Sequence, residues 1–190
     1  MDSMFDENAL NEVLQIVQKP ARYIGREWNS IKKDPQKVEL RLALAFPDLY
    51  DLGLGNTGLH ILYGILNVVP WCWAERVYAP APDMRAALRE RGLELFTLES
   101  KTPLKAMDAI GFSLQSELTY TTVLGMLELA AIPLRTAQRD SSHPLVFAGG
   151  PCALNPEPLS PFIDFFVLGD GEEVVLEIAE VLRSGPPERE

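Results

Sequence analysis

Leu145-Val-Phe-Ala-Gly-Gly-Pro151 decides the fold together with Phe165-Phe-Val-Leu-Gly-Asp-Gly171, because each is a short apolar run that ends in a glycine turn. Such runs are typical of strands buried on both faces, as in a parallel sheet. Glycine lets the backbone turn sharply and lets a ligand approach closely. Turns at the carboxyl ends of neighbouring parallel strands share one edge, where open α/β sheets bind ligands. The two stretches therefore predict a ligand site at that edge.

Strand and helix signals alternate along most of the chain. Besides 145–148 and 163–168, strands are predicted over 38–46, 74–79 and 109–114. Apolar residues at helical spacing predict helices with these stripes: Leu59, Leu62, Tyr63 and Leu66; Met84, Ala87 and Leu88; Val123, Met126, Leu127 and Ala130; Val175, Ile178, Ala179 and Leu182. Five strands alternating with helices predict an α/β fold with a doubly wound, mainly parallel five-stranded sheet. The flavodoxin-like order 2-1-3-4-5 is one such arrangement.

Local signals predict where several elements begin and end. Asp83 is the expected N-cap of the helix that contains Met84, Ala87 and Leu88, and Gly92 is the residue at which that helix is expected to end. Residues 93–98 read as a short additional strand. The last helix is expected to start at Glu172.

The sequence also predicts three parts. Residues 1–37 form an expected arm, with an amphipathic helix over 8–18 that Pro20 ends, packing on the main domain or on a partner. Residues 38–183 form the main Rossmann-like domain. Residues 184–190 have the proline-rich composition of a linker to a further domain.

Composition narrows the functional classes. The chain has 190 residues and a formal net charge of −10 without a Lys/Arg run, which disfavours a nucleic-acid surface. Its two cysteines, Cys72 and Cys152, lie far apart and form no CxxC, as suits a reducing cytosol. No apolar stretch reaches the ~20 residues that span a bilayer, and the acidic N-terminus is not a signal peptide. These features predict a cytoplasmic protein without nucleic-acid or membrane partners.

Gly53-Leu-Gly-Asn-Thr-Gly58 satisfies the dinucleotide-binding pattern G-x-G-x-x-G. However, six residues separate it from the preceding strand, and the acid expected at the end of the second strand is missing, since Glu75 lies at its start. A dinucleotide site is therefore the less favoured interpretation. The alternatives are a glycine-rich loop that leads into a helix, and a loop over 47–58 that covers a ligand.

Other polar residues near the predicted edge have structural and functional interpretations. Ser113 to Glu117 reach the same edge but are also suited to helix capping. Asp170, Glu172 and Glu173 are expected to complement a helix dipole, and they disfavour a bare phosphate there. His60 reads as a helix-surface or capping residue, and Cys152 as a small buried one, so neither predicts a metal site.

Several motifs in combination resemble a known family. They are Phe46-Pro-Asp-Leu-Tyr-Asp-Leu-Gly53, Asn56-Thr-Gly-Leu-His-Ile-Leu-Tyr63, Glu75-Arg-Val-Tyr-Ala-Pro80, Pro82-Asp-Met84, Leu98-Glu-Ser100, Gly111-Phe-Ser-Leu-Gln-Ser-Glu117, Gly149-Gly-Pro-Cys-Ala-Leu-Asn-Pro-Glu157 and Val167-Leu-Gly-Asp-Gly-Glu-Glu173. With these, the chain resembles the N-terminal, B12-binding-like region of cobalamin-binding-type radical SAM proteins. More narrowly, it resembles an uncharacterised family of large radical SAM fusion proteins. The resemblance covers about residues 38–182.

The resemblance implies a larger parent protein. In that family a barrel follows, in which a C-x-x-x-C-x-x-C motif holds a [4Fe–4S] cluster that cleaves S-adenosylmethionine. The present chain contains no such motif, so we expect an excised N-terminal domain that is not catalytic alone. Its implied role is to bind cobalamin or to present substrate to the barrel. The alternative role is a structural module that docks on the barrel without a ligand.

Cobalamin itself is implied with departures from the family pattern. The histidine motif D-x-H-x-x-G is absent where the chain reads Asp48-Leu-Tyr-Asp-Leu-Gly53. In the companion S-x-L element Ser113 is present but the leucine falls one place early, whereas Gly149-Gly150 match. Cobalamin is therefore expected without a protein histidine ligand, or its binding has been lost. The expected cofactor-binding residues are Asn56, Thr57, Ser113, Gln115, Gly149, Gly150, Pro151, Gly169 and Gly171.

Overall fold

A five-stranded, wholly parallel sheet forms the centre of the protein. The computed structural model describes residues 6–185. The strands are β1 (Leu40–Leu49), β2 (Cys72–Ala79), β3 (Ala109–Ser113), β4 (Leu145–Gly149) and β5 (Phe165–Phe166). They lie in the order β2-β1-β3-β4-β5. The predicted α/β class and the flavodoxin-like strand order are confirmed.

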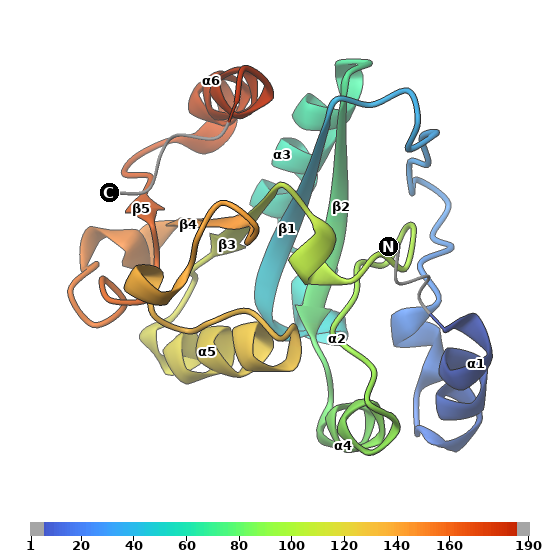
Figure 1. The fold of residues 1–190 in the computed structure, drawn as a ribbon. Coiled ribbons are helices and arrows are strands. Elements are labelled where there is room, and N and C mark those ends of the chain that lie inside the picture. The colour runs from blue at the N-terminus through green and yellow to red at the C-terminus, as the bar shows by residue number, and fades with distance from the viewer. Residues whose placement is uncertain (1–5, 186–190) are drawn as a thin grey trace.

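Helices cover both faces of this sheet (Figure 1). The α-helices are α1 (Glu7–Ile16), α2 (Tyr50–Gly53), α3 (Thr57–Val68), α4 (Pro82–Arg91), α5 (Tyr120–Leu129) and α6 (Gly171–Arg183). Short 3-10 turns are η1 (Pro20–Tyr23), η2 (Leu104–Ala106), η3 (Glu117–Thr119), η4 (Thr136–Gln138) and η5 (Pro151–Leu154). α3 and α6 lie on one face, and α4 and α5 lie on the other, with α1 beside α4.

Alternation along β1 assigns its side chains to the two faces. Leu40, Leu42 and Leu44 belong to the core that includes α3 and α6. Ala43 and Ala45, which point the opposite way, belong to the core that includes α1, α4 and α5. Because successive strand residues face opposite sides, this one strand contributes to both layers of the core.

Three local expectations are wrong. Ala81 is the N-cap of α4, with Pro82 as its first residue, and the Asp83 carboxylate instead accepts the backbone N–H of Gln18 at 2.8 Å. The extra strand over 93–98 is absent from the described residues, where this loop makes only an isolated bridge from Phe96. The predicted fifth strand over 163–168 shortens to β5, because its pairing with β4 covers only two residues.

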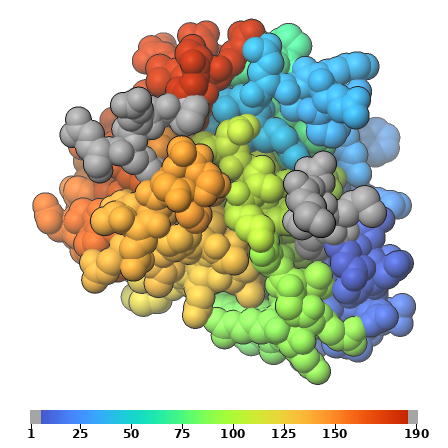
Figure 2. All heavy atoms as spheres, viewed as in Figure 1, coloured from blue at the N-terminus to red at the C-terminus, as the bar shows by residue number. Residues whose placement is uncertain are grey.

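The arm and the loop after α4 cover β2, the outer strand on one side of the sheet. Leu98 donates its N–H to the carbonyl of Arg76 at 2.8 Å, and Trp73 Nε1 donates to the carbonyl of Ile31 at 3.1 Å. Gly25 has φ +65, and a Cβ there would lie 1.9 Å from the Leu98 oxygen. In Figure 2 the arm (blue) and this loop (yellow-green) adjoin on the surface. The covered strand is not open to pairing with another chain.

Buried charges join these segments to β2. Arg76 donates from Nε and from its backbone N–H to the two Glu99 oxygens, at 2.7 Å each. Its Nη2 donates to Glu27 Oε2 at 2.9 Å, and the Tyr50 hydroxyl donates to the other Glu27 oxygen at 2.8 Å. Arg76 and Glu99 are both almost wholly buried. A buried ion pair is tolerated only when its atoms are paired in this way.

A second buried carboxylate, Glu75, lies one residue earlier on β2. Arg41 forms an ion pair with it. Thr97 Oγ1 and the Ser100 N–H donate to its second oxygen at 2.8 and 3.0 Å. Glu75 therefore holds the loop after α4 against the sheet.

Candidate ligand pocket at the carboxyl edge of the sheet

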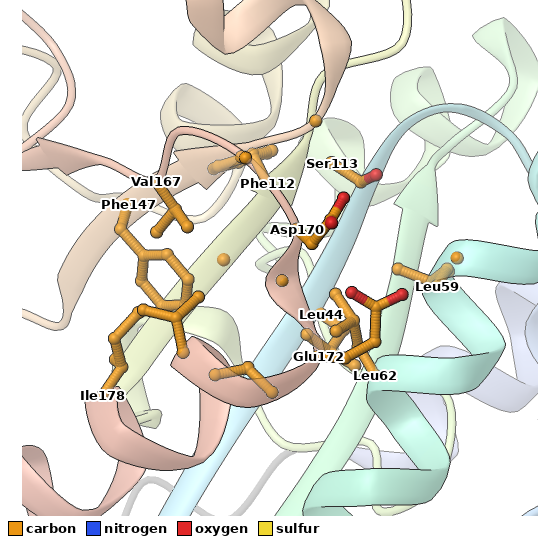
Figure 3. A pocket seen from close by; sticks show the side chains of 18 of the residues that line it. Leu44, Leu59, Leu62, Phe112, Ser113, Phe147, Val167, Asp170, Glu172 and Ile178 are labelled. Atoms are coloured by element: carbon orange, nitrogen blue, oxygen red, sulfur yellow. The ribbon is translucent and has the colours of Figure 1, made fainter.

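A pocket of about 200 Å³ lies between α3 and α6 at the carboxyl edge of the sheet (Figure 3). Segments far apart in the sequence meet there: Leu44; Gly58, Leu59 and Leu62; Gly111 to Ser113 and Gln115; Phe147, Gly149 and Gly150; Val167 and Gly169 to Glu172; Val174, Val175 and Ile178. The two glycine turns thus meet at one edge, as the sequence predicted.

Apolar side chains form the walls of the pocket. In Figure 3, Phe147, Val167 and Ile178 lie together on one side, and Leu59 and Leu62 of α3 lie on the facing side. These side chains come from β4, from the turn before α6, from α6 and from α3. The walls suit an apolar or aromatic group.

Glycine keeps the backbone close to this space. Gly150 has φ +100, and a Cβ there would lie 2.8 Å from the Leu114 carbonyl oxygen. Gly169 has φ +97 with open space around it. Because φ is positive at both positions, a side chain at either would be strained. Gly149 has no such constraint, since a Cβ there would make only ordinary contacts with Val167, the nearer at 3.6 Å.

Polar groups are few and lie near the turn into α6. Gln115 Nε2 donates to Ser113 Oγ at 2.9 Å. Asp170 is the N-cap of α6, but its side chain caps no backbone N–H. Asp170 and Glu172 both line the pocket, so two acidic side chains lie at its mouth. This arrangement favours hydrogen-bond donors and neutral groups over a bare phosphate.

The structure brings together six of the nine expected binding residues. The pocket lining includes Ser113, Gln115, Gly149, Gly150, Gly169 and Gly171. It does not include the other three. Asn56 caps α3 by accepting the Leu59 N–H at 2.8 Å, Thr57 is the first residue of α3, and Pro151 begins η5.

The G-x-G-x-x-G segment has a packing role at its first position. A Cβ on Gly53 would lie 2.5 Å from the Tyr78 ring and 2.7 Å from the Phe46 ring. The one acidic residue of β2, Glu75, is buried and forms an ion pair with Arg41, so it is not placed to bind a ribose. These contacts favour the structural interpretation of the motif.

His60 and Cys152, for which the sequence predicts no metal site, both contact neighbouring residues. His60 Nε2 lies 2.5 Å from the Leu54 carbonyl oxygen. Cys152 is half-buried rather than buried, and burial together with Glu117 raises the pKa of its thiol. Among residues 6–185, no group of three or more His, Cys, Asp or Glu side chains is placed to hold a metal ion. Nor does any helix there combine the length and apolar character needed to cross a membrane.

Sequence reasoning missed the apolar walls of the pocket. The sequence predicts Phe147 and Val167 within buried strands, and it predicts Leu59, Leu62 and Ile178 within the apolar stripes of helices. Apolar spacing indicates burial without telling a packed core from a pocket wall. The glycines between these residues were the only local signal of unfilled space.

Comparison with known proteins identifies a family that the chain matches. The family model described as radical SAM proteins, N-terminal, matches residues 58–189, which is more than half of the chain. No curated protein and no solved structure matches it. The matched range includes the pocket segments from α3, β3, β4 and α6.

Proposed function

The chain belongs to the family of N-terminal domains of radical SAM proteins, and on this premise we propose that it is an accessory domain that binds cobalamin between α3 and α6. The observation that carries the proposal is the pocket itself. Glycine turns after β4 and β5 converge on it at the carboxyl edge, where open α/β sheets bind ligands. The radical chemistry would belong to a catalytic domain of the same protein.

The residues present suit the aromatic end of cobalamin's nucleotide tail. Phe147 and Ile178 on one side and Leu62 on the other offer apolar contacts and exclude water. Gly149 and Gly150 line this space and present no side chain that would block the tail. When bound, cobalamin supplies organometallic chemistry that no side chain offers.

The charged mouth sets the expected binding mode. Asp170 and Glu172 disfavour a free nucleotide, so a bulky ligand with one shielded phosphodiester fits better. His60 contacts the Leu54 carbonyl oxygen, and the loop after β1 contains no histidine. We therefore propose that cobalamin binds base-off without a protein imidazole.

Titration with hydroxocobalamin tests this proposal. Wild-type protein should change the visible absorbance of the ligand. Gly149→Val places a branched side chain in the pocket at an unstrained backbone position, and binding should weaken by about tenfold or more, or about 1.4 kcal/mol. The matched control is Gly125→Val on α5, on the opposite face, where the nearest atom to a Cβ is 4.0 Å away.

Two results would contradict the proposal. A folded wild-type protein that leaves the hydroxocobalamin spectrum unchanged at high concentration would remove cobalamin as the ligand. A complex whose spectrum changes with His60→Ala would show that a protein imidazole reaches cobalt after all.

A further inference from the structure

Each of four connections at the carboxyl edge exposes a leucine. Leu52 after β1 is 63% exposed, and Leu118 after β3 is 90% exposed. Leu154 after β4 is 76% exposed, and Leu168 after β5 is 62% exposed. Single exposed leucines are ordinary, but four around one edge make a set. We call this surface the leucine rim.

The leucine rim is also acidic throughout. Its four connections, 50–56, 114–119, 150–160 and 167–170, each contain a carboxylate: Asp51, Glu117, Glu157 and Asp170. None of them contains a lysine, arginine or histidine. Asp51 is paired with Lys19 and Arg22 of the arm. Among the described residues no lysine or arginine forms an ion pair with the other three.

We propose that the leucine rim is the docking face for the catalytic domain of the radical SAM protein to which this domain belongs, and that the matching face of that domain is apolar and basic. Exposed apolar residues among charged ones mark protein interfaces, and opposite charge on the partner orients the encounter. A second copy of this chain would bring acidic rim against acidic rim, so the charge favours a different partner.

The position of the pocket also supports the catalytic domain as the partner that docks on the leucine rim. The pocket is lined by three of the connections that carry the leucine rim, those after β3, β4 and β5. A domain seated on the rim would therefore cover the pocket mouth. The docking inference rests on the rim residues and on the family, and it holds whether or not cobalamin binds.

The direction of α6 sets one geometric requirement. α6 starts at the carboxyl edge and has 13 residues, so it ends about 20 Å away, toward the amino edge. A chain that continues from α6 needs about six extended residues to return to the rim.

Amide hydrogen exchange in the full-length protein without cobalamin tests the docking face. We expect residues 114–119, 150–160 and 167–170 to exchange about tenfold or more slowly there than in the isolated domain. Leu118→Asp with Leu154→Asp in the full-length protein should remove that protection. Val68→Asp, at an equally exposed position at the far end of α3, is the matched control and should leave it unchanged.

Two outcomes would overturn the inference. Equal exchange of the rim in the full-length protein and the isolated domain would mean that nothing docks there. Concentration-dependent protection of the rim in the isolated domain, with a dimer by light scattering, would assign the surface to a second copy instead.

Discussion

The β2 side of the sheet and the space between α3 and α6 differ in how completely they are filled. At β2, the arm and the loop after α4 close the sheet with buried charges such as Arg76 and Glu99. Between α3 and α6, glycines and apolar side chains leave a pocket open at the carboxyl edge. The closed side positions the sheet, and the open side is where we propose that a ligand binds.

The comparison of these two regions shows that conspicuous polar residues can have a structural role, whereas small residues shape the candidate pocket. Glu75 and Glu99 carry chemistry that suggests function, yet each is fully engaged with neighbouring donors. Gly149 and Gly169 carry no chemistry, yet they keep the pocket free of side chains. Buried carboxylates whose two oxygens both accept hydrogen bonds specify where a segment lies.

Removing a charge from the closed side should have the largest effect on stability. Glu99→Ala leaves the Arg76 guanidinium and its backbone N–H without this buried acceptor. We expect the free energy of unfolding to fall by about 3–5 kcal/mol. Urea denaturation measures it.

Two further variants sharpen that test. Glu128→Ala removes the partner of Arg89 in an exposed ion pair and should cost about 0–1 kcal/mol. If Glu99→Ala does not fold, the double variant Arg76→Met with Glu99→Leu should regain a folded state, since an apolar pair of similar volume replaces a buried ion pair well. A loss for Glu99→Ala no larger than for Glu128→Ala would refute a structural role for the buried charges.

A side chain on the open side should have a smaller effect. Gly150→Val places a Cβ 2.8 Å from the Leu114 oxygen at φ +100, and we expect a cost of about 1–3 kcal/mol from strain. Gly64→Ala, in α3 with open space around it, should instead stabilise the protein by up to about 1 kcal/mol. Equal thermal unfolding of wild type and Gly150→Val would show that the turn does not need glycine.

Acid should weaken the attachment of the arm. Burial opposes ionisation of Glu27, but the Tyr50 hydrogen bond and Arg76 outweigh it and lower the pKa of Glu27 below 4.5. A lowered folded pKa means that this stabilisation is fully present above pH 4.5 and is lost as pH falls through the folded pKa. At pH 7, Glu27→Gln should cost about 1–2 kcal/mol, and the difference from wild type should vanish at low pH. Urea midpoints from pH 3 to 7 measure this, and a gap that stays constant over that range would contradict the assignment.

Much of the fold followed from spacing along the chain. The strands β1 to β4 and the stripes of α3, α5 and α6 appear close to their predicted positions, because periodic burial is a local property of the sequence. The prediction of Asp83 as an N-cap is wrong because its carboxylate accepts the backbone N–H of Gln18, which is distant in the sequence. Residues 93–98 resembled a strand, but they cover β2 without extending the sheet.

The sequence by itself determined the parallel sheet and the edge at which its glycine turns meet, because strand periodicity and positive-φ glycines are encoded residue by residue. The tertiary structure alone decided that Phe147, Leu62 and Ile178 line a pocket, and that Glu27, Arg76 and Glu99 form a buried cluster. Both depend on side chains from distant segments meeting in space. No periodicity within one segment reports whether the gap between two helices is filled, or which charge will face another across a strand.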